Sequence, residues 1–169
     1  MSTFKKIDPL MIEDNPFKLI GKDWMLITAG TINKYNTMTA SWGSFGVLWN
    51  KNACTIYVRP TRYTYEFLEK YDYFTLSFLP EKYRAALNFC GANSGKEVDK
   101  VSKTGLTPVA GDFGIYFKEA RLIIECKKIF YADLKPGLFL DKKADSAYYP
   151  KKDYHRIYIG EILNCLAKQ

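Results

Sequence analysis

Two neighbouring stretches of the chain contain the residue types best suited to hold a planar, phosphorylated ligand. Residues 36–46 are rich in hydroxyls, small residues and glycine, which allow close approach to the backbone and supply hydrogen-bond donors. Residues 56–64 are an apolar run that ends in two arginines and two threonines around Pro60. Arginine forks and hydroxyls at a strand end suit a phosphate. Together the stretches fit a mononucleotide such as FMN, although two ordinary strands with polar turns would have a similar composition.

The chain offers little acid–base or metal-binding chemistry of its own. His155 is the one histidine, and spacing supports no Ser/His/Asp, Cys/His or metal-ligand arrangement, so no metal is expected. The four cysteines, Cys54, Cys90, Cys126 and Cys165, form no CxxC pair. Cys54 and Cys126 lie in apolar runs, which is typical of reduced core thiols. If the protein is an enzyme, a cofactor therefore performs the difficult chemistry and the protein orients it.

Strands dominate the elements that must position these residues. Strands are predicted over residues 24–30, 38–41, 53–58, 73–79, 115–120, 121–131 and 155–162, and short helices over 64–70, 81–89 and 97–103. The first two strands predict a hairpin, and the long apolar run 121–131 predicts a central strand. No Gly-x-Gly-x-x-Gly fingerprint or regular strand–helix alternation supports a doubly wound sheet. The pattern predicts a mainly β fold, an antiparallel barrel with short helical insertions.

Three segments read as irregular. Residues 4–20, with two prolines, predict an extended arm or edge strand rather than a long helix. Residues 42–50 interleave two glycines with large apolar side chains, which predicts a bend or a close backbone approach instead of a regular strand. Residues 133–152 are polar and form a loop of the length that often covers a site.

Chain length, net charge and the distribution of apolar residues limit the classes of protein to which the chain could belong. A chain of 169 residues predicts one domain, spanning residues 1–169. Lysine and arginine number 25 against 18 acids, which gives a net charge of +7 and permits an anionic ligand. The charge is spread along the chain without a basic run, so no nucleic-acid partner is expected. No signal peptide or membrane-spanning run is present in the sequence, which predicts a cytoplasmic protein without a membrane partner.

Four motifs, in order, resemble the flavin reductase-like family of FMN-binding split-barrel proteins, with flavoredoxin-type members the nearest. They are Asn36-x-Met38-Thr39-Ala40-Ser41-Trp42-Gly43, Val58-Arg59-Pro60-Thr61-Arg62-Tyr63-Thr64, Ser94-Gly95-Lys96-Glu97-Val98-Asp99-Lys100 and Tyr154-His155-Arg156-Ile157-Tyr158-Ile159-Gly160-Glu161. The resemblance implies an antiparallel split β-barrel, a homodimer with FMN at its interface, and a reduced nicotinamide, NADH or NADPH, as a possible electron donor.

The resemblance also implies a set of cofactor-binding residues: Asn36, Met38, Thr39, Ala40, Ser41, Trp42, Arg59, Thr61, Arg62, Thr64, Ser94 and Lys96. Those from Thr39 to Trp42 would line the isoalloxazine ring, and the others from Arg59 onwards would surround the phosphate. His155 aligns with a position where a nicotinamide or substrate could dock, and it is the one candidate catalytic residue. Local chemistry alone favours a plain helix cap for Ser94 and a solvated lysine for Lys96, and His155 could equally be a structural histidine.

One departure from the family's pattern lies near the end of the chain. Short-chain flavin reductases often have a Gly-Asp-His element, whereas this chain has Lys152-Asp153-Tyr154-His155, without the glycine. We therefore keep three hypotheses. The first is an FMN-dependent oxidoreductase that passes electrons from a nicotinamide or partner protein to a flavin, a ferric chelate or another small-molecule or protein acceptor. The second is a non-enzymatic FMN electron carrier or redox sensor, and the third is a nucleic-acid-binding barrel.

Overall fold

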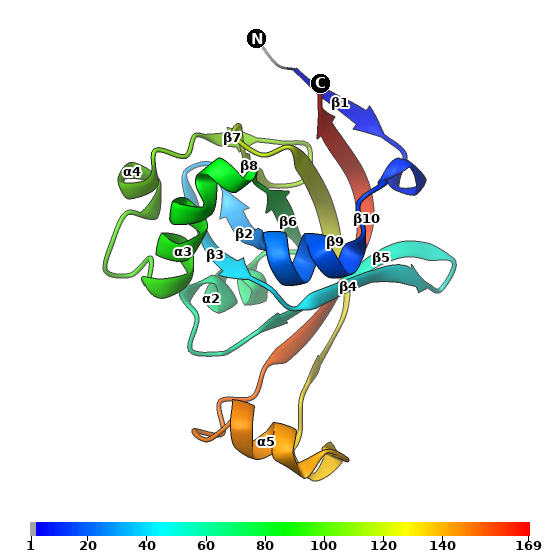
Figure 1. Cartoon of the computed structure of the whole chain (residues 1–169), viewed down its shortest axis with the longest axis vertical. Coiled ribbons are helices and arrows are strands. Elements are labelled where there is room, and N and C mark those ends of the chain that lie inside the picture. Colours follow the sequence, from blue (N-terminus) through cyan, green and yellow to red (C-terminus); the bar gives the residue numbers. More distant parts are fainter. Residues whose placement is uncertain (1–2) are drawn as a thin grey trace.

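A curved antiparallel sheet of eight strands forms the centre of the protein (Figure 1). The structure is a computed structural model, and it describes residues 3–169. Seven strands follow the order β3-β2-β6-β9-β10-β5-β4, and β1 pairs with β10 beside this path. The strands are β1 (Phe4–Ile7), β2 (Met25–Thr31), β3 (Lys34–Ala40), β4 (Gly43–Leu48), β5 (Lys51–Val58), β6 (Tyr73–Phe78), β9 (Leu122–Asp133) and β10 (Arg156–Lys168). A separate pair, β7 (Pro108–Ala110) and β8 (Ile115–Phe117), forms a small second sheet.

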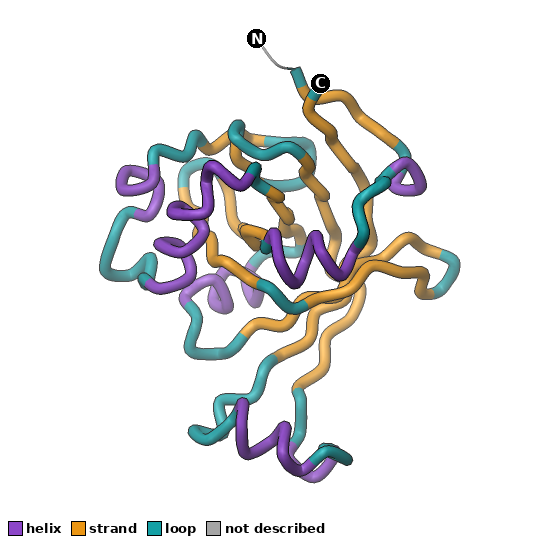
Figure 2. The backbone as a smooth tube through the Cα atoms, in the orientation of Figure 1, coloured by secondary structure: helices purple, strands orange, loops and turns teal. Residues whose placement is uncertain are grey.

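Short helices lie around the sheet rather than within it (Figure 2). They are α1 (Pro16–Lys18), α2 (Tyr63–Lys70), α3 (Arg84–Ala92), α4 (Lys100–Thr104) and α5 (Lys142–Tyr148), with shorter turns η1 (Pro9–Met11), η2 (Leu19–Asp23), η3 (Glu81–Tyr83) and η4 (Pro136–Leu138). Within residues 3–169, no helix is both long enough and apolar enough to cross a membrane. The architecture confirms the prediction of a mainly β, antiparallel fold with short helical insertions.

Strand β9 lies in the middle of the sheet, as the apolar run predicted. Its first half, from Leu122 to Cys126, is fully buried between β6 and β10. The main core gathers on this strand, with Phe74 from β6 and Tyr158 from β10 among its largest buried side chains. The Sγ atoms of Cys54 and Cys126 lie 3.4 Å apart in this core. All four cysteines are buried and free, which confirms that Cys54 and Cys126 are reduced core thiols.

The close backbone approach predicted for residues 42–50 is present at Gly43, but the prediction that no regular strand forms there was wrong, because β4 is a regular strand. It pairs with β5 from Gly43 opposite Ile56 to Leu48 opposite Lys51. A Cβ atom added at Gly43 would lie 2.8 Å from the carbonyl oxygen of Thr55, so this glycine permits close approach of the two strands. Trp49 and Asn50 supply the turn with positive φ angles of 52° and 58°.

Two other irregular segments contain more structure than predicted. Residues 4–20 begin with an edge strand, β1, as expected, but continue into the helical turns η1, α1 and the start of η2. Residues 133–152, predicted as a loop, contain η4 and α5 and join β9 to β10. In Figure 1 this connection, hereafter the α5 excursion (residues 134–155), stands away from the barrel at one end. The helix predicted over 97–103 begins only at Lys100, because Asp99 caps it by accepting from the backbone N–H of Val101 and Ser102.

Gly160 lies where β10 packs most closely against Phe74 and Cys126 of the core. A Cβ atom there would lie 2.6 Å from the ring of Phe74 and 2.9 Å from Cβ of Cys126, at a shift in register between β10 and β9. We expect Gly160→Ala to lower the free energy of unfolding by about 1–3 kcal/mol through overpacking. Urea denaturation measures this as a lower midpoint with an unchanged m-value.

The matched control is Gly46→Ala in β4, where an added Cβ meets nothing within 4 Å. This variant should unfold at or slightly above the wild-type midpoint, since a strand glycine is replaced without a clash. Equal midpoints for the two variants would contradict the close packing at Gly160.

Candidate functional site

Nine residues from three strand ends line a small cavity of about 180 Å³, which we call the histidine cavity. They come from the end of β3 and the link to β4, from the end of β5 and the turn after it, and from the residue before β10: Met38, Thr39, Ala40, Ser41, Trp42, Tyr57, Arg59, Arg62 and His155. Strands β3, β5 and β10 all end or begin at this point. The sheet therefore brings residues far apart in the sequence to one place.

A second cavity of about 140 Å³ adjoins the first, and we call it the Ser94 cavity. It is lined by Asn36, Met38, Thr61, Arg62, Tyr63, Thr64, Ala92, Asn93, Ser94, Gly95 and Lys100. The two cavities share Met38 and Arg62. Between them they contain every predicted cofactor-binding residue except Lys96.

Close packing fixes one wall of the Ser94 cavity. Asn36 donates a 2.7 Å hydrogen bond from Nδ2 to the hydroxyl of Thr64, so the Thr64 hydroxyl keeps its own proton free to donate elsewhere. A Cβ atom at Gly95 would lie 1.9 Å from Oδ1 of Asn36. The loop at Ser94 and Gly95 can therefore lie against β3 only because residue 95 has no side chain.

The two arginines have different partners. Arg59 forms a 2.6 Å ion pair with Asp153 and donates a 2.8 Å hydrogen bond to the carbonyl oxygen of Tyr148. Its guanidinium also lies 5.1 Å from the ring centre of Tyr149. Arg62 donates one 2.7 Å hydrogen bond, to the carbonyl oxygen of Gly91, and it faces both cavities. Arg59 therefore ties the α5 excursion to β5, while Arg62 has more donors left for a ligand.

Lys96 and Lys100 differ in a similar way. Lys96 lies outside both cavities, where its ammonium contacts Glu66 at 2.5 Å and its side chain is 57% exposed. Lys100 is buried, with 6% of its surface exposed, and its Nζ donates 2.8 Å hydrogen bonds to the carbonyl oxygens of Thr37 and Cys90. Burial lowers the pKa of Lys100. These two carbonyls use two of its three N–H groups, and Lys100 lines the Ser94 cavity.

Sequence reasoning missed Lys100 as a site residue. It closes the third motif, but a lysine in a short charged helix is usually solvated, and its burial depends on carbonyls from β3 and α3. A lysine directly after the capping Asp99 was the one available signal. Tyr149 was missed for a related reason, because nothing in a polar connection predicts a phenol that turns back onto the sheet.

His155 is buried and has a defined hydrogen-bond partner. Its Nδ1 lies 2.8 Å from the hydroxyl of Tyr149, and its ring centre lies 5.1 Å from that of Trp42. Burial lowers the pKa of His155, and the nearby cations Arg59 and Arg62 lower it further against the opposing effect of Asp153, to about 4. The ring is therefore neutral at pH 7.

The Tyr149 contact defines which nitrogen of His155 carries the proton. Burial raises the pKa of Tyr149, so its hydroxyl stays protonated. A phenol is a strong hydrogen-bond donor and a neutral imidazole nitrogen a strong acceptor, so the hydroxyl donates to Nδ1. The proton of the ring then lies on Nε2. His155 presents an N–H donor on the wall of the histidine cavity.

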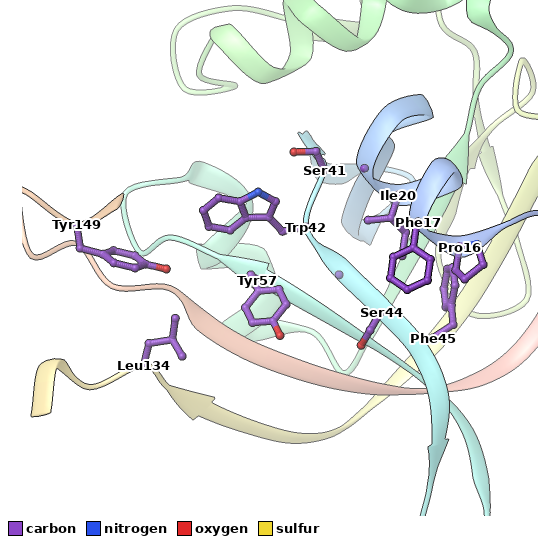
Figure 3. Close-up of a pocket in the computed structure, with 12 residues that line it drawn as sticks. Pro16, Phe17, Ile20, Ser41, Trp42, Ser44, Phe45, Tyr57, Leu134 and Tyr149 are labelled. Atoms are coloured by element: carbon purple, nitrogen blue, oxygen red, sulfur yellow. The ribbon is translucent and has the colours of Figure 1, made fainter. Parts of the chain in front are cut away.

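A larger pocket of about 510 Å³ lies beside the histidine cavity and shares Ser41, Trp42 and Tyr57 with it (Figure 3). Phe17 and Phe45 lie at one end of this pocket in Figure 3, and Tyr149 lies at the other. We call it the aromatic pocket.

Comparison with known proteins identifies the family of the chain. Residues 18–169 match the sequence model of the flavin reductase like domain, and the chain belongs to this family. No curated protein sequence matches the chain. The structure is similar to that of an FMN-binding domain of a flavin reductases-like enzyme from Shewanella baltica, with a TM-score of 0.69 and 16% identity over 98% of this chain and 78% of that chain.

Two further structures have the same fold. Flavoredoxin of Desulfovibrio vulgaris matches with a TM-score of 0.66 and 22% identity over 96% of this chain and 76% of that chain. An NADH:FAD oxidoreductase from Streptomyces globisporus matches with a TM-score of 0.65 and 17% identity over 86% of this chain and 75% of that chain. These likenesses confirm the predicted split-barrel fold.

The protonation of His155 can be measured directly, because it is the one histidine of the chain. We expect ¹⁵N-detected ring spectra to show a proton on Nε2 and none on Nδ1 at pH 7, with protonation only near pH 4. Since the unfolded chain binds this proton near pH 6.5, His155 contributes stability that is present above about pH 6.5 and is lost as the pH falls towards 4.

Tyr149→Phe removes the donor to Nδ1, so we expect a mixture of tautomers and protonation at a higher pH. Tyr148→Phe is the control, because Tyr148 contacts Arg59 through its backbone carbonyl and Trp42 through its ring. Its spectra should match the wild type. An Nδ1–H signal in the wild type, or an unchanged spectrum in Tyr149→Phe, would contradict the assignment.

Proposed function

We propose that this protein binds FMN and acts as an oxidoreductase of the flavin reductase or flavoredoxin type. The observation that carries the proposal is the pair of adjoining cavities, one walled by rings, hydroxyls and backbone and the other by cations and hydroxyls. Membership of the flavin reductase like domain family supports it. The related structures include an FMN-binding domain, a flavoredoxin and an NADH:FAD oxidoreductase, and they support the same function.

The residues present fit the two ends of FMN. Among the described residues that line one or the other cavity are three cations, Arg59, Arg62 and Lys100, and no carboxylate. This charge suits a phosphate. We assign the phosphate to the Ser94 cavity, where Arg62, Lys100 and Ser94 would hold it. Thr61 and Thr64 would add hydroxyl donors there. Gly95 lets the loop that contains Ser94 lie against Asn36 of β3, which keeps Ser94 at this cavity.

The ring of the cofactor is assigned to the histidine cavity, against the backbone from Thr39 to Trp42. The hydroxyl of Thr39 donates a 2.5 Å hydrogen bond to the carbonyl oxygen of Leu87. That residue therefore contributes its backbone, and Ser41 its hydroxyl. Trp42 packs across the cavity towards His155 and helps to exclude water.

When bound, FMN would supply the transfer of electrons between a donor and an acceptor. The chain's own part is to hold and orient the reactants. His155 would donate from Nε2–H to a group in the histidine cavity while remaining neutral at pH 7. It would thus orient a carbonyl or amide group rather than add a full positive charge. The donor is proposed to be NADH, NADPH or a partner protein.

The test of this function is the visible spectrum of the purified protein. We expect oxidised-flavin bands, extraction of FMN on denaturation, and bleaching of the bands when NADH or NADPH is added without oxygen. Bands that persist with both nucleotides would favour the non-enzymatic electron carrier, fed by another protein. A protein that neither contains nor takes up FMN would contradict the proposal and favour the nucleic-acid-binding barrel.

Alanine variants of the cations test where the phosphate of FMN binds, with FMN binding as the measured quantity. Loss of a charge-assisted contact costs about 1.5–3 kcal/mol, so Arg62→Ala should weaken FMN binding by about 10-fold to 100-fold. Lys96→Ala should weaken it less, because Lys96 is largely exposed and paired with Glu66. Exposed Lys70, at the end of α2 and outside both cavities, supplies the control Lys70→Ala, which should leave binding unchanged. Full flavin retention in Arg62→Ala would refute the phosphate assignment.

We also propose a homodimer. Apolar side chains lie exposed near the β4–β5 turn: Val47 on β4, and Trp49, whose ring centre lies 6.4 Å from that of Phe130 on β9. Contiguous exposed apolar side chains often mark protein contacts. Light scattering should give about twice the chain mass of 19.5 kDa, and Trp49→Lys should shift the mass towards the monomer. A wild-type monomer at micromolar concentration would contradict the proposal.

A further inference from the structure

The aromatic pocket has no assigned occupant in the function proposed above. Twelve residues line it: Pro16, Phe17, Ile20, Gly21, Ser41, Trp42, Gly43, Ser44, Phe45, Tyr57, Leu134 and Tyr149 (Figure 3). Its volume of about 510 Å³ lies within the usual range for small-molecule sites. Its walls come from α1, η2, the link between β3 and β4, β4, β5 and the α5 excursion.

The chemistry of the lining selects an uncharged, flat molecule. Five of the twelve described lining residues have aromatic rings, and none is charged. Aromatic walls pack well against a planar ring, in stacked or edge-on contact. An ion placed there would lose its hydration without a partner of opposite charge, at a large cost in free energy. The polar side-chain groups of the lining are all neutral: the hydroxyls of Ser41, Ser44, Tyr57 and Tyr149 and the indole N–H of Trp42, which suit a carbonyl oxygen.

Continuity with the histidine cavity places such a molecule beside the proposed flavin. Ser41, Trp42 and Tyr57 belong to both spaces. Arg59 and Arg62 line the histidine cavity but not the aromatic pocket, so the cationic and uncharged regions are separate. A molecule bound in the aromatic pocket would therefore lie next to the proposed flavin ring without contacting Arg59 or Arg62.

We infer that the aromatic pocket binds an uncharged cyclic carbonyl compound of the quinone type as the electron acceptor. This inference rests on the proposed function and narrows its acceptor. The overall reaction balances: one NADH or NADPH, one proton and one quinone give the oxidised nucleotide and one hydroquinone. The quinone gains two electrons and two protons, one on each carbonyl oxygen, and its ring becomes aromatic.

The same lining argues against two acceptors considered from the sequence. A ferric chelate is bulky and usually charged, and the twelve lining residues provide no counter-charge. A free flavin nucleotide has a phosphate or diphosphate that would find no cation in this pocket. A second copy of the chain could cover the open side of the pocket, and the experiment below includes that outcome.

Paired ligands test the inference. Equilibrium dialysis of the purified protein, with its flavin content read from the visible spectrum, compares naphthoquinone with naphthoquinone sulfonate at physiological salt. We expect the uncharged quinone to bind at least about tenfold more tightly, because the sulfonate must be desolvated without a partner. Quinone-dependent oxidation of NADH or NADPH should follow the same preference.

Phe17 offers a clean variant, because its side chain lines the pocket and yet the residue is 86% exposed. Phe17→Ala should weaken naphthoquinone binding severalfold and leave flavin content unchanged. Leu10, which is 84% exposed in η1 and outside the pocket, supplies the control Leu10→Ala, with wild-type binding expected.

Several outcomes would overturn the inference. These are equal binding of the two probes, wild-type binding by Phe17→Ala, or no quinone binding by a flavin-loaded dimer. In each case a protein that still contains flavin reducible by a nicotinamide leaves the proposed function intact. A protein without flavin overturns the proposed function instead, and the acceptor role with it, even if the quinone binds.

Discussion

The antiparallel pairing of β9 and β10 is the constraint on which the rest of the structure depends. The two strands pair from Leu122 opposite Ala167 to Asp133 opposite Arg156. At one end the pair is buried in the core and supports β6 on one side and β5 on the other. At the other end it projects from the core and leads into the α5 excursion. The place where the pair leaves the core is where β3, β5 and β10 meet, so the same pairing that closes the sheet also sets the position of His155.

Hydrogen bonds within the protein divide the cations of the site into two groups. Arg59 is held by Asp153 and the carbonyl oxygen of Tyr148, and its role is structural, because it ties the α5 excursion to β5. Lys100 is held by two carbonyls yet lines the Ser94 cavity, and Arg62 makes a single contact with Gly91. Because these groups are positioned before any ligand arrives, little side-chain entropy remains to be lost on binding.

Much of the fold was predictable from the sequence because it rests on local patterns. Alternating and continuous apolar runs predicted β2, β5, β6 and β9, and the motif from Asn36 to Trp42 predicted residues that do lie together. β4 was missed because Gly43 allows close contact between two strands, and local composition cannot distinguish such a glycine from one at a bend. Lys100 and Tyr149 were missed because their partners lie on other elements. Local chemistry contains no information about a carbonyl that becomes a neighbour only after folding.

Tyr149 gives the α5 excursion a significance beyond covering a site. The excursion lies outside the buried core, yet it supplies the hydroxyl that bonds Nδ1 of His155 and one wall of the aromatic pocket. Its sequence could therefore diverge during evolution while the strand pairing and the lining of the Ser94 cavity stay as they are. Selection could in this way alter which molecules the aromatic pocket accepts by changing one insertion, without the risk of unfolding that accompanies changes in the core.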